Sequence, residues 1–182
     1  MSTKITTGRN TRFSYVNVFE AKSINGSNPK YSVSLIIPKE DEETVAKIKK
    51  AIQEAYDDGQ GKLKGTGKSV PSLKALKTPL RDGDLERPDD EAYANAYFIN
   101  ANSPQKPGVW DAKKNPLTEE DVYSGCYGRA SISFYAYNAQ GNKGIACGLN
   151  AIQKLRDGEP LGGRGNTADD FDIEDEEDDD IL

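Results

Sequence analysis

A short glycine- and lysine-containing loop is the first place where this 182-residue chain could do chemistry. Gly65-Thr-Gly-Lys-Ser69 resembles the end of a phosphate-binding loop, but the full pattern needs a glycine five residues before Gly67, where this chain has Lys62. Such a loop should also follow a strand and begin a helix. Here it follows a predicted helix and precedes Pro71, so we interpret it as a flexible basic loop.

Two acidic clusters, Asp82-Gly-Asp84 and Asp89-Asp-Glu91, carry the carboxylates with which a nuclease could hold Mg²⁺. No carboxylates at predicted strand ends accompany them, so solvated turns are the simpler interpretation. The chain has no histidine, the commonest general base and metal ligand. Cys126 and Cys147 are too few for a structural zinc site, and we expect them to be reduced thiols in the core. The composition favours a binding protein over an enzyme, with no metal and no cofactor.

Aromatic and basic side chains that share strand faces are more informative. Alternation along residues 129–137 places Arg129, Ser131, Ser133, Tyr135 and Tyr137 on one side. Exposed aromatic rings beside cations suit single-stranded nucleic acid, because unpaired bases stack on the rings and the phosphates require positive charge. Any one of these rings could instead pack in a core.

A second such face lies on the predicted strand 11–20, where alternation separates Phe13, Tyr15, Asn17 and Phe19 from Ser14, Val16 and Val18. From both faces and their surroundings we expect bases to stack on Phe13, Tyr15, Phe19, Trp110, Tyr135 and Tyr137. We expect phosphates to be bound by Arg9, Arg12, Lys74, Lys77, Arg81, Lys113, Lys114, Arg129 and Lys143.

The elements that must position these residues are mostly strands. Strands are predicted at 11–20, 30–37, 96–101, about 109–110, 129–137 and 143–149. Apolar residues at helical spacing predict one clear helix over 41–57, and Gly59 ends it. Residues 58–95 are predicted to be a long loop region, and residues 150–156 a short helix.

The order of these elements predicts a mainly β fold. Strands and helices do not alternate regularly, as a doubly wound sheet would require. Five or more antiparallel strands with one inserted helix and long loops fit a small closed barrel, and the oligonucleotide-binding (OB) barrel is the common host of that pattern. No apolar stretch approaches the roughly 20 residues of a membrane span. Because the N-terminus has no signal-peptide pattern, we expect a cytoplasmic protein.

The last fourteen residues, 169–182, hold ten carboxylates and no base, and they end in Ile181-Leu182. The whole chain has a net charge of −6, whereas residues 1–168 carry 24 bases and 20 acids, a net of +4. We therefore expect a binding domain over 1–164 and a disordered acidic tail over 165–182. The tail could compete with DNA for the basic domain and recruit a partner protein through Asp178, Asp179, Asp180, Ile181 and Leu182, or it could only aid solubility.

The tail tip, Asp-Asp-Asp-Ile-Leu, is similar to the tip of bacterial single-stranded DNA-binding proteins, although their final Pro-Phe is absent. The body resembles a family of phage and prophage single-stranded DNA-binding proteins, formerly a conserved family of unknown function. The stretches that carry this resemblance are 30–39, 78–84, 122–131, 141–150 and 157–163.

The resemblance implies an OB barrel that coats single strands, without strong sequence preference, during phage DNA replication or recombination. It implies replication or recombination proteins as partners of the tail, and it leaves open whether the protein is a monomer or a dimer. It transfers no individual DNA contact. The alternatives are an accessory adapter that acts through protein contacts and an enzyme of DNA metabolism.

Overall fold

The computed structural model describes residues 3–23 and 28–161. The strands are β1 (Lys4–Thr6), β2 (Thr11–Lys22), β3 (Lys30–Pro38), β4 (Arg81–Asp82), β5 (Ala96–Ser103), β6 (Gly108–Trp110), β7 (Tyr127–Ala139) and β8 (Asn142–Arg156). The helices are α1 (Glu42–Asp58), α2 (Gln60–Lys64) and α3 (Gly83–Glu86), with 3-10 turns η1 (Leu73–Ala75) and η2 (Glu91–Tyr93). The acidic tail predicted over 165–182 lies outside the described residues.

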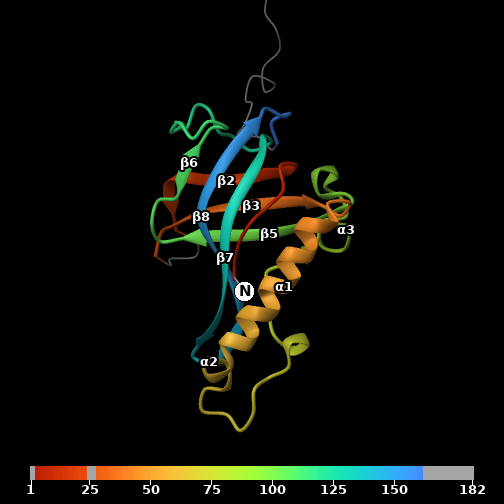
Figure 1. Cartoon of the computed structure of the whole chain (residues 1–182), viewed down its shortest axis with the longest axis vertical. Helices are drawn as coiled ribbons and strands as arrows, with labels where there is room; N and C mark the ends of the chain where they lie inside the picture. The colour runs from red at the N-terminus through yellow and green to blue at the C-terminus, as the bar shows by residue number, and fades with distance from the viewer. Residues whose placement is uncertain (1–2, 24–27, 162–182) are drawn as a thin grey trace, which may run out of the picture.

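Five strands close into a barrel. β2 pairs with β3, β3 with β5, β7 with β8 and β7 with β2, all antiparallel. The remaining seam is parallel and joins β5 to β8 through Asn102 and Gly148. Three short strands pair alongside the barrel strands: β1 with β7, β6 with β8 and β4 with β5. This arrangement confirms the predicted OB-type, mainly β fold, and Figure 1 shows β7 and β8 running steeply across β2, β3 and β5.

The hairpin of β7 and β8 supplies much of the core. Ala130, Ile132, Phe134 and Ala136 are buried as their alternation predicts, opposite buried residues of β8.

The predicted helix over 150–156 is wrong, because β8 continues to Arg156. A register shift beside Asn150 keeps the strand in pairing, and β6 then supplies its second neighbour. Pairing on both sides satisfies the backbone of this segment better than one isolated helical turn would.

Strand β2 does not keep the alternation predicted for it. Its pairing with β3 shifts register between Ser14 and Asn17, and Tyr15 has a positive φ of 48°. Such a bulge adds a residue and resets which side chains face inward. Phe13 and Val18, predicted on opposite faces, are therefore both fully buried, and Ser14 is buried between them.

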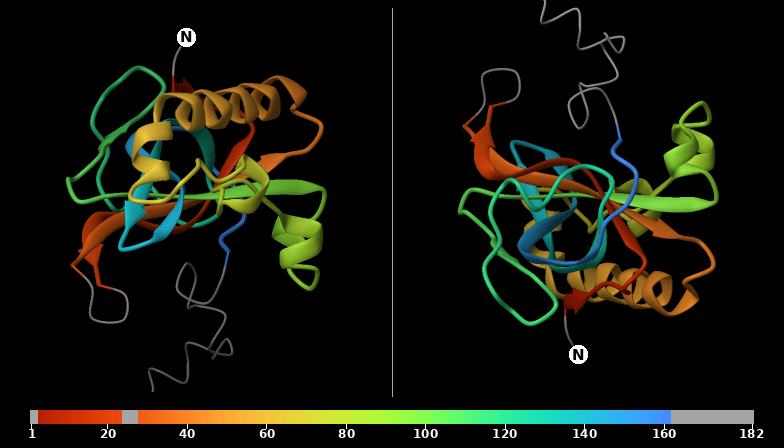
Figure 2. Two further views of the ribbon diagram at one scale, coloured as in Figure 1. Left: turned by 90° about the horizontal axis from the view of Figure 1, so that it is seen from below. Right: turned by 90° about the horizontal axis from the view of Figure 1, so that it is seen from above.

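Helix α1 lies along one side of the strands, as both views in Figure 2 show. Its predicted bounds are confirmed to within one residue, and Asp41 caps it by accepting hydrogen bonds from the Thr44 amide at 3.2 Å and hydroxyl at 2.7 Å. Val45, Ile48 and Ile52 are buried against the barrel. Gly59 ends the helix, and a Cβ added there would lie 2.3 Å from the Cβ of Ala136 on β7.

Residues 58–95 were predicted to be a long loop, but they contain several short elements. Tyr93 of η2 packs edge-on against Phe98, with ring centroids 5.0 Å apart, and both join Ile36 in a small core outside the barrel. In the same region Lys39 forms ion pairs with Asp82 at 2.9 Å and Asp84 at 2.8 Å. Hydrogen bonds from Lys39 hold the pKa of both carboxylates below the ordinary range. One of the predicted acidic clusters is therefore part of a lysine-centred ion-pair network.

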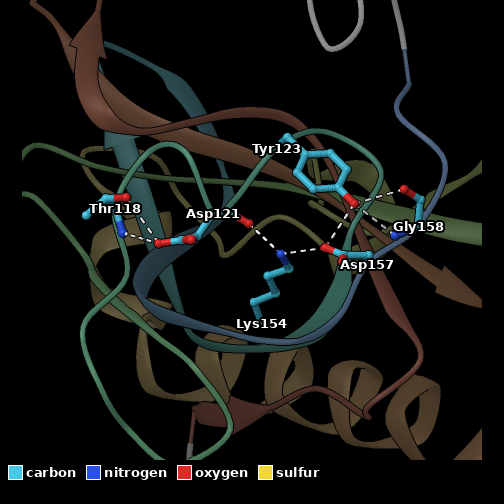
Figure 3. Close-up of polar contacts among 6 residues, drawn as sticks. All are labelled: Thr118, Asp121, Tyr123, Lys154, Asp157 and Gly158. Atoms are coloured by element: carbon cyan, nitrogen blue, oxygen red, sulfur yellow. Dashed lines mark hydrogen bonds and ion pairs between the residues drawn. The ribbon is translucent and has the colours of Figure 1, made fainter.

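A polar cluster holds the chain just after β8 (Figure 3). The Tyr123 hydroxyl lies 3.1 Å from Asp157 Oδ1 and donates to the Gly158 carbonyl at 2.9 Å. Lys154 forms an ion pair with Asp157 at 2.6 Å and donates to the Asp121 carbonyl at 2.5 Å. These contacts fix the point at which the chain leaves the barrel toward the acidic tail.

None of the helices in the described part of the chain is long and apolar enough to cross a membrane.

Candidate nucleic-acid interface

The first candidate site is a groove of about 500 Å³ beside the outward faces of β5, β7 and β8, here called the tyrosine groove. It combines two tyrosines, three basic residues and two asparagines. Its lining consists of Lys30, Lys77, Thr78, Pro79, Arg81, Asn100, Asn102, Tyr135, Tyr137, Ile145, Ala146 and Cys147. The structure thus brings together four residues predicted for DNA binding, Lys77, Arg81, Tyr135 and Tyr137.

Small residues on β8 give the two tyrosine rings their positions. Tyr135 pairs with Ala146 and Tyr137 with Gly144. A Cβ added at Gly144 would lie 2.8 Å from the Tyr137 hydroxyl, and one at Gly148 would lie 3.5 Å from Tyr135 Cε1. Both rings therefore lean over the glycines of the neighbouring strand. Tyr135 remains 48% exposed, which leaves its ring accessible to a base.

The cations of the groove come from separate elements. The Lys77 carbonyl accepts from the Ile145 amide at 2.8 Å, which holds the segment leading to β4 alongside β8. Arg81 pairs with Phe98 in the sheet, and its guanidinium contacts Glu86 at 2.8 Å. Because Arg81 and Glu86 are both more than 40% exposed, solvent screens this ion pair and the arginine can still attract phosphate.

Sequence reasoning missed Lys30, Asn100 and Asn102 as members of the groove. The asparagines alternate with the buried residues Ile99 and Ala101 on β5, so the same period-2 analysis would have found them. Their amides can donate and accept hydrogen bonds at base edges or sugars.

A second hollow, of about 400 Å³, lies at the other end of the β7–β8 hairpin and is here called the tryptophan pocket. Its lining consists of Thr6, Trp110, Lys114, Arg129, Ala130, Ser131, Ala151, Ile152 and Gln153. Three of the predicted residues, Trp110, Lys114 and Arg129, meet here. Arg129, Gln153 and Trp110 occupy one rung across β7, β8 and β6, and Trp110 is 39% exposed.

Two of the predicted aromatic residues support the fold. The prediction that a base stacks on Phe13 is wrong, because the bulge in β2 places this ring in the core with no exposed surface. Phe19 is partly buried and packs against the core, with Lys106 5.7 Å from its ring centre.

Tyr15 is 57% exposed but lies in neither hollow. Arg87 covers its ring at 5.3 Å and donates to its hydroxyl at 3.3 Å. This hydrogen bond raises the pKa of Arg87 above its ordinary value.

The remaining predicted basic residues also lie outside the two hollows. Arg12 donates to the carbonyls of Gly125 at 3.0 Å and Glu159 at 2.7 Å, and it stacks on Tyr127, so it ties β2 to the segments just before β7 and just after β8. Lys143 lies 3.4 Å from the Lys64 carbonyl. Arg9, Lys74 and Lys113 are exposed.

Comparison with known proteins gives the relationships of the chain. Residues 3–182 match the family model described as Enterobacter phage Enc34, ssDNA-binding protein. The putative protein p50 of Acyrthosiphon pisum secondary endosymbiont phage 1 is 32% identical over 161 residues, which cover 86% of this chain and 85% of that protein.

Solved structures agree with this relationship. The single-stranded DNA-binding protein from bacteriophage Enc34, in complex with ssDNA, is similar with a TM-score of 0.71 and 27% identity, over 87% of this chain and 89% of that one. Gp2.5, a single-stranded DNA-binding protein encoded by bacteriophage T7, shares the fold, with a TM-score of 0.59 and 16% identity over 94% and 96% of the two chains. The chain therefore belongs to the family of the Enterobacter phage Enc34 single-stranded DNA-binding protein.

Proposed function

We propose that this protein binds and coats single-stranded DNA without strong sequence preference, and that bases stack on Tyr135 and Tyr137 in the tyrosine groove. The observation that carries the proposal is the meeting of these rings with Lys77 and Arg81 on one outward surface. Family membership supports it, because the Enc34 protein was solved in complex with ssDNA.

The chemistry of the groove favours unpaired strands. Every base has a face that can stack, so binding through Tyr135 and Tyr137 tolerates any sequence, at about 1–3 kcal/mol per stacked base. A duplex hides these faces inside its own stack. Lys30, Lys77 and Arg81 supply positive charge for phosphates, and contacts to phosphates carry no sequence information. None of these three residues belongs to a helix that could read base edges.

The role that we propose is a binding role in phage DNA replication or recombination, in the cytoplasm of the host, without catalysis. One of the two acidic clusters that first resembled a metal site supports this, because Asp82 and Asp84 are paired with Lys39. We further propose that the acidic tail competes with DNA for the basic body and recruits replication or recombination proteins through Ile181 and Leu182. The net charge of +4 on residues 1–168 against ten carboxylates in 169–182 supports this competition.

The proposal is tested by comparing the affinities of the full chain for oligo-dT, oligo-dC and a blunt duplex at one salt concentration. We expect strong binding to both single strands and much weaker binding to the duplex. Each phosphate that the protein neutralises should add about −0.7 to the slope of log K against log salt. Equal affinity for duplex and single strand would contradict the proposal, and no binding to either would favour an accessory role through protein contacts.

A further inference from the structure

The outward face of β7 joins the tyrosine groove to the tryptophan pocket. Arg129 lines the pocket at one end and Tyr135 lines the groove at the other, with Ser131 and Ser133 between them on the same side of the strand. Arg129 and Tyr135 are six residues apart along the strand, which corresponds to a Cα separation of about 20 Å. At the roughly 3.4 Å rise per nucleotide of a strand in duplex DNA this distance corresponds to about six nucleotides, and a more extended single strand crosses it with fewer.

The surface between the two hollows suits a phosphate backbone. The Asn150 amide donates to Ser133 at 2.9 Å and lies 3.4 Å from Ser131. On β8 the residues opposite the serines are Gly148 and Ala151, and on β1 they are Lys4 and Thr6. These neighbours are small, polar or basic, so no carboxylate from these paired positions repels a strand that crosses here.

Trp110 is held in place at the pocket by its own strand. A Cβ added at Gly108 would lie 2.5 Å from the Trp110 Nε1, so the indole is folded against the glycine. The following loop brings Lys114, with a positive φ of 69°, into the same hollow.

Asp111 organises this loop through hydrogen bonds to its backbone. It accepts hydrogen bonds from the amides of Lys113 and Asn115, both at 2.8 Å. Because Asn115, and more weakly Lys113, favour its ionised form, the pKa of Asp111 lies below the ordinary value. Its charge is thus engaged by the loop backbone.

The chemistry of the pocket matches an aromatic ligand that carries negative charge. Trp110, Ala151 and Ile152 provide apolar surface, and the volume of about 400 Å³ lies within the range of small-ligand pockets. Arg129 and Lys114 provide two cations, and neither forms an ion pair with another residue in the described ranges. A base with its flanking phosphates satisfies both features.

We propose that the tryptophan pocket is a second base-binding subsite for the same DNA strand that occupies the tyrosine groove, so that full affinity requires a strand long enough to reach both. This inference rests on the proposed function. It adds that the site is bipartite, with Trp110 and Tyr135 as its two stacking positions. Affinity should rise steeply once an oligonucleotide spans the two hollows, whose lining residues Arg129 and Tyr135 are about 20 Å apart along β7.

The test is binding of dT3 and dT20, measured by isothermal titration calorimetry, to the full chain and to Trp110→Ala, Trp110→Phe and Tyr135→Ala. Leu85→Ala, which removes a side chain 78% exposed and outside both hollows, is the control. We expect Trp110→Ala and Tyr135→Ala each to weaken dT20 binding by about 5- to 150-fold, the equivalent of 1–3 kcal/mol. At most one of them should weaken dT3, because three nucleotides do not span the two subsites. Trp110→Phe should retain most of the affinity for dT20.

Two outcomes of these titrations would overturn the inference. In the first, Trp110→Ala binds dT20 as the unchanged protein does while Tyr135→Ala does not, which leaves the proposed function intact. In the second, both variants weaken dT3 equally, which places the two rings at one subsite. If the chain without any substitution does not bind dT20, the proposed function itself is refuted.

A competing occupant of the pocket is the apolar end of the acidic tail. The intrinsic fluorescence of Trp110, the single tryptophan, distinguishes the two. Without DNA, the full chain and its Ile181→Ser/Leu182→Ser variant should have the same emission maximum, and dT20 should quench both. A shift in the variant before DNA is added would assign the pocket to the tail and overturn our assignment.

Discussion

Tyr137 on β7 lies across Gly144, its pairing partner on β8. A Cβ at Gly144 would lie 2.8 Å from the tyrosine hydroxyl and 2.6 Å from the Lys77 carbonyl. One glycine thus lets a ring that lines the tyrosine groove and the backbone of a basic residue approach the same point. The groove depends on the absence of a side chain as much as on the residues that line it.

Gly144→Ala should therefore damage both the fold and DNA binding. The added methyl group meets backbone that cannot rotate away, and overpacking of this kind costs about 1–3 kcal/mol of unfolding free energy. Urea unfolding and oligo-dT titration measure the two effects. Gly61→Ala is the matched control, because a Cβ there has no neighbour within 4 Å. Equal behaviour of the two variants would show that the close approach has no role.

Neighbouring residues on β7 should separate stability from binding. Phe134 is buried at 2% exposure, and Phe134→Ala should lower the unfolding free energy by about 3–5 kcal/mol. Tyr135→Ala should leave the thermal midpoint nearly unchanged and weaken oligo-dT binding by about 1–3 kcal/mol. Tyr15→Ala removes a similarly exposed tyrosine outside the groove and should bind like the unchanged protein. A Tyr135→Ala variant that unfolds early but binds normally would invert these roles.

The polar cluster after β8 predicts a pH-dependent contribution to stability. The hydrogen bond from Lys154, together with that from Tyr123 and the lysine charge, lowers the pKa of Asp157. A carboxylate whose pKa is lowered by folding stabilises the fold above its unfolded pKa of about 3.9, and this contribution disappears as the pH falls through the folded-state pKa.

Asp157→Asn should accordingly lower the thermal midpoint at pH 7, and the difference from the unchanged protein should vanish in strong acid. Thermal unfolding between pH 2 and pH 7 follows this, with Asp89→Asn, at an exposed aspartate elsewhere, as the control. A pH-independent difference would mean that the ion pair with Lys154 contributes nothing.

The tail should reduce DNA affinity at low salt. Ten carboxylates tethered to a body of opposite charge are present near it at high effective concentration, and salt screens their attraction. Deleting residues 169–182 should raise oligo-dT affinity at 50 mM salt and change it little at 300 mM. Removing Ile181-Leu182 alone should leave DNA affinity unchanged and abolish recruitment of a partner. Identical affinities with and without the tail at the lower salt concentration would leave it a solubilising segment.

Much of the barrel follows from local sequence patterns. Residues 130, 132, 134 and 136 alternate with polar and aromatic residues, so both the buried face of β7 and the outward position of Tyr135 could be predicted. The apolar spacing and Gly59 likewise predicted α1.

The failures have tertiary causes. The local sequence does not indicate the bulge at Tyr15, because the bulge is fixed by pairing with β3. The bulge moves Phe13 into the core. Residues 150–156 form a strand because β6 and β7 flank them. The tyrosine groove depends on a long-range backbone bridge between Lys77 and Gly144. The sequence therefore indicates the residues of the groove but not that they lie together.

The most direct test of the central claim is to identify which residues contact the bases. Oligo-dT containing 5-iodouracil, bound to the full chain and irradiated, cross-links preferentially to stacked aromatic side chains, and mass spectrometry locates the modified peptides. We predict cross-links at Tyr135 and Tyr137 in the tyrosine groove. Cross-links confined to Tyr15, or to residues outside β7 and the two hollows, would contradict our account of the DNA-binding surface.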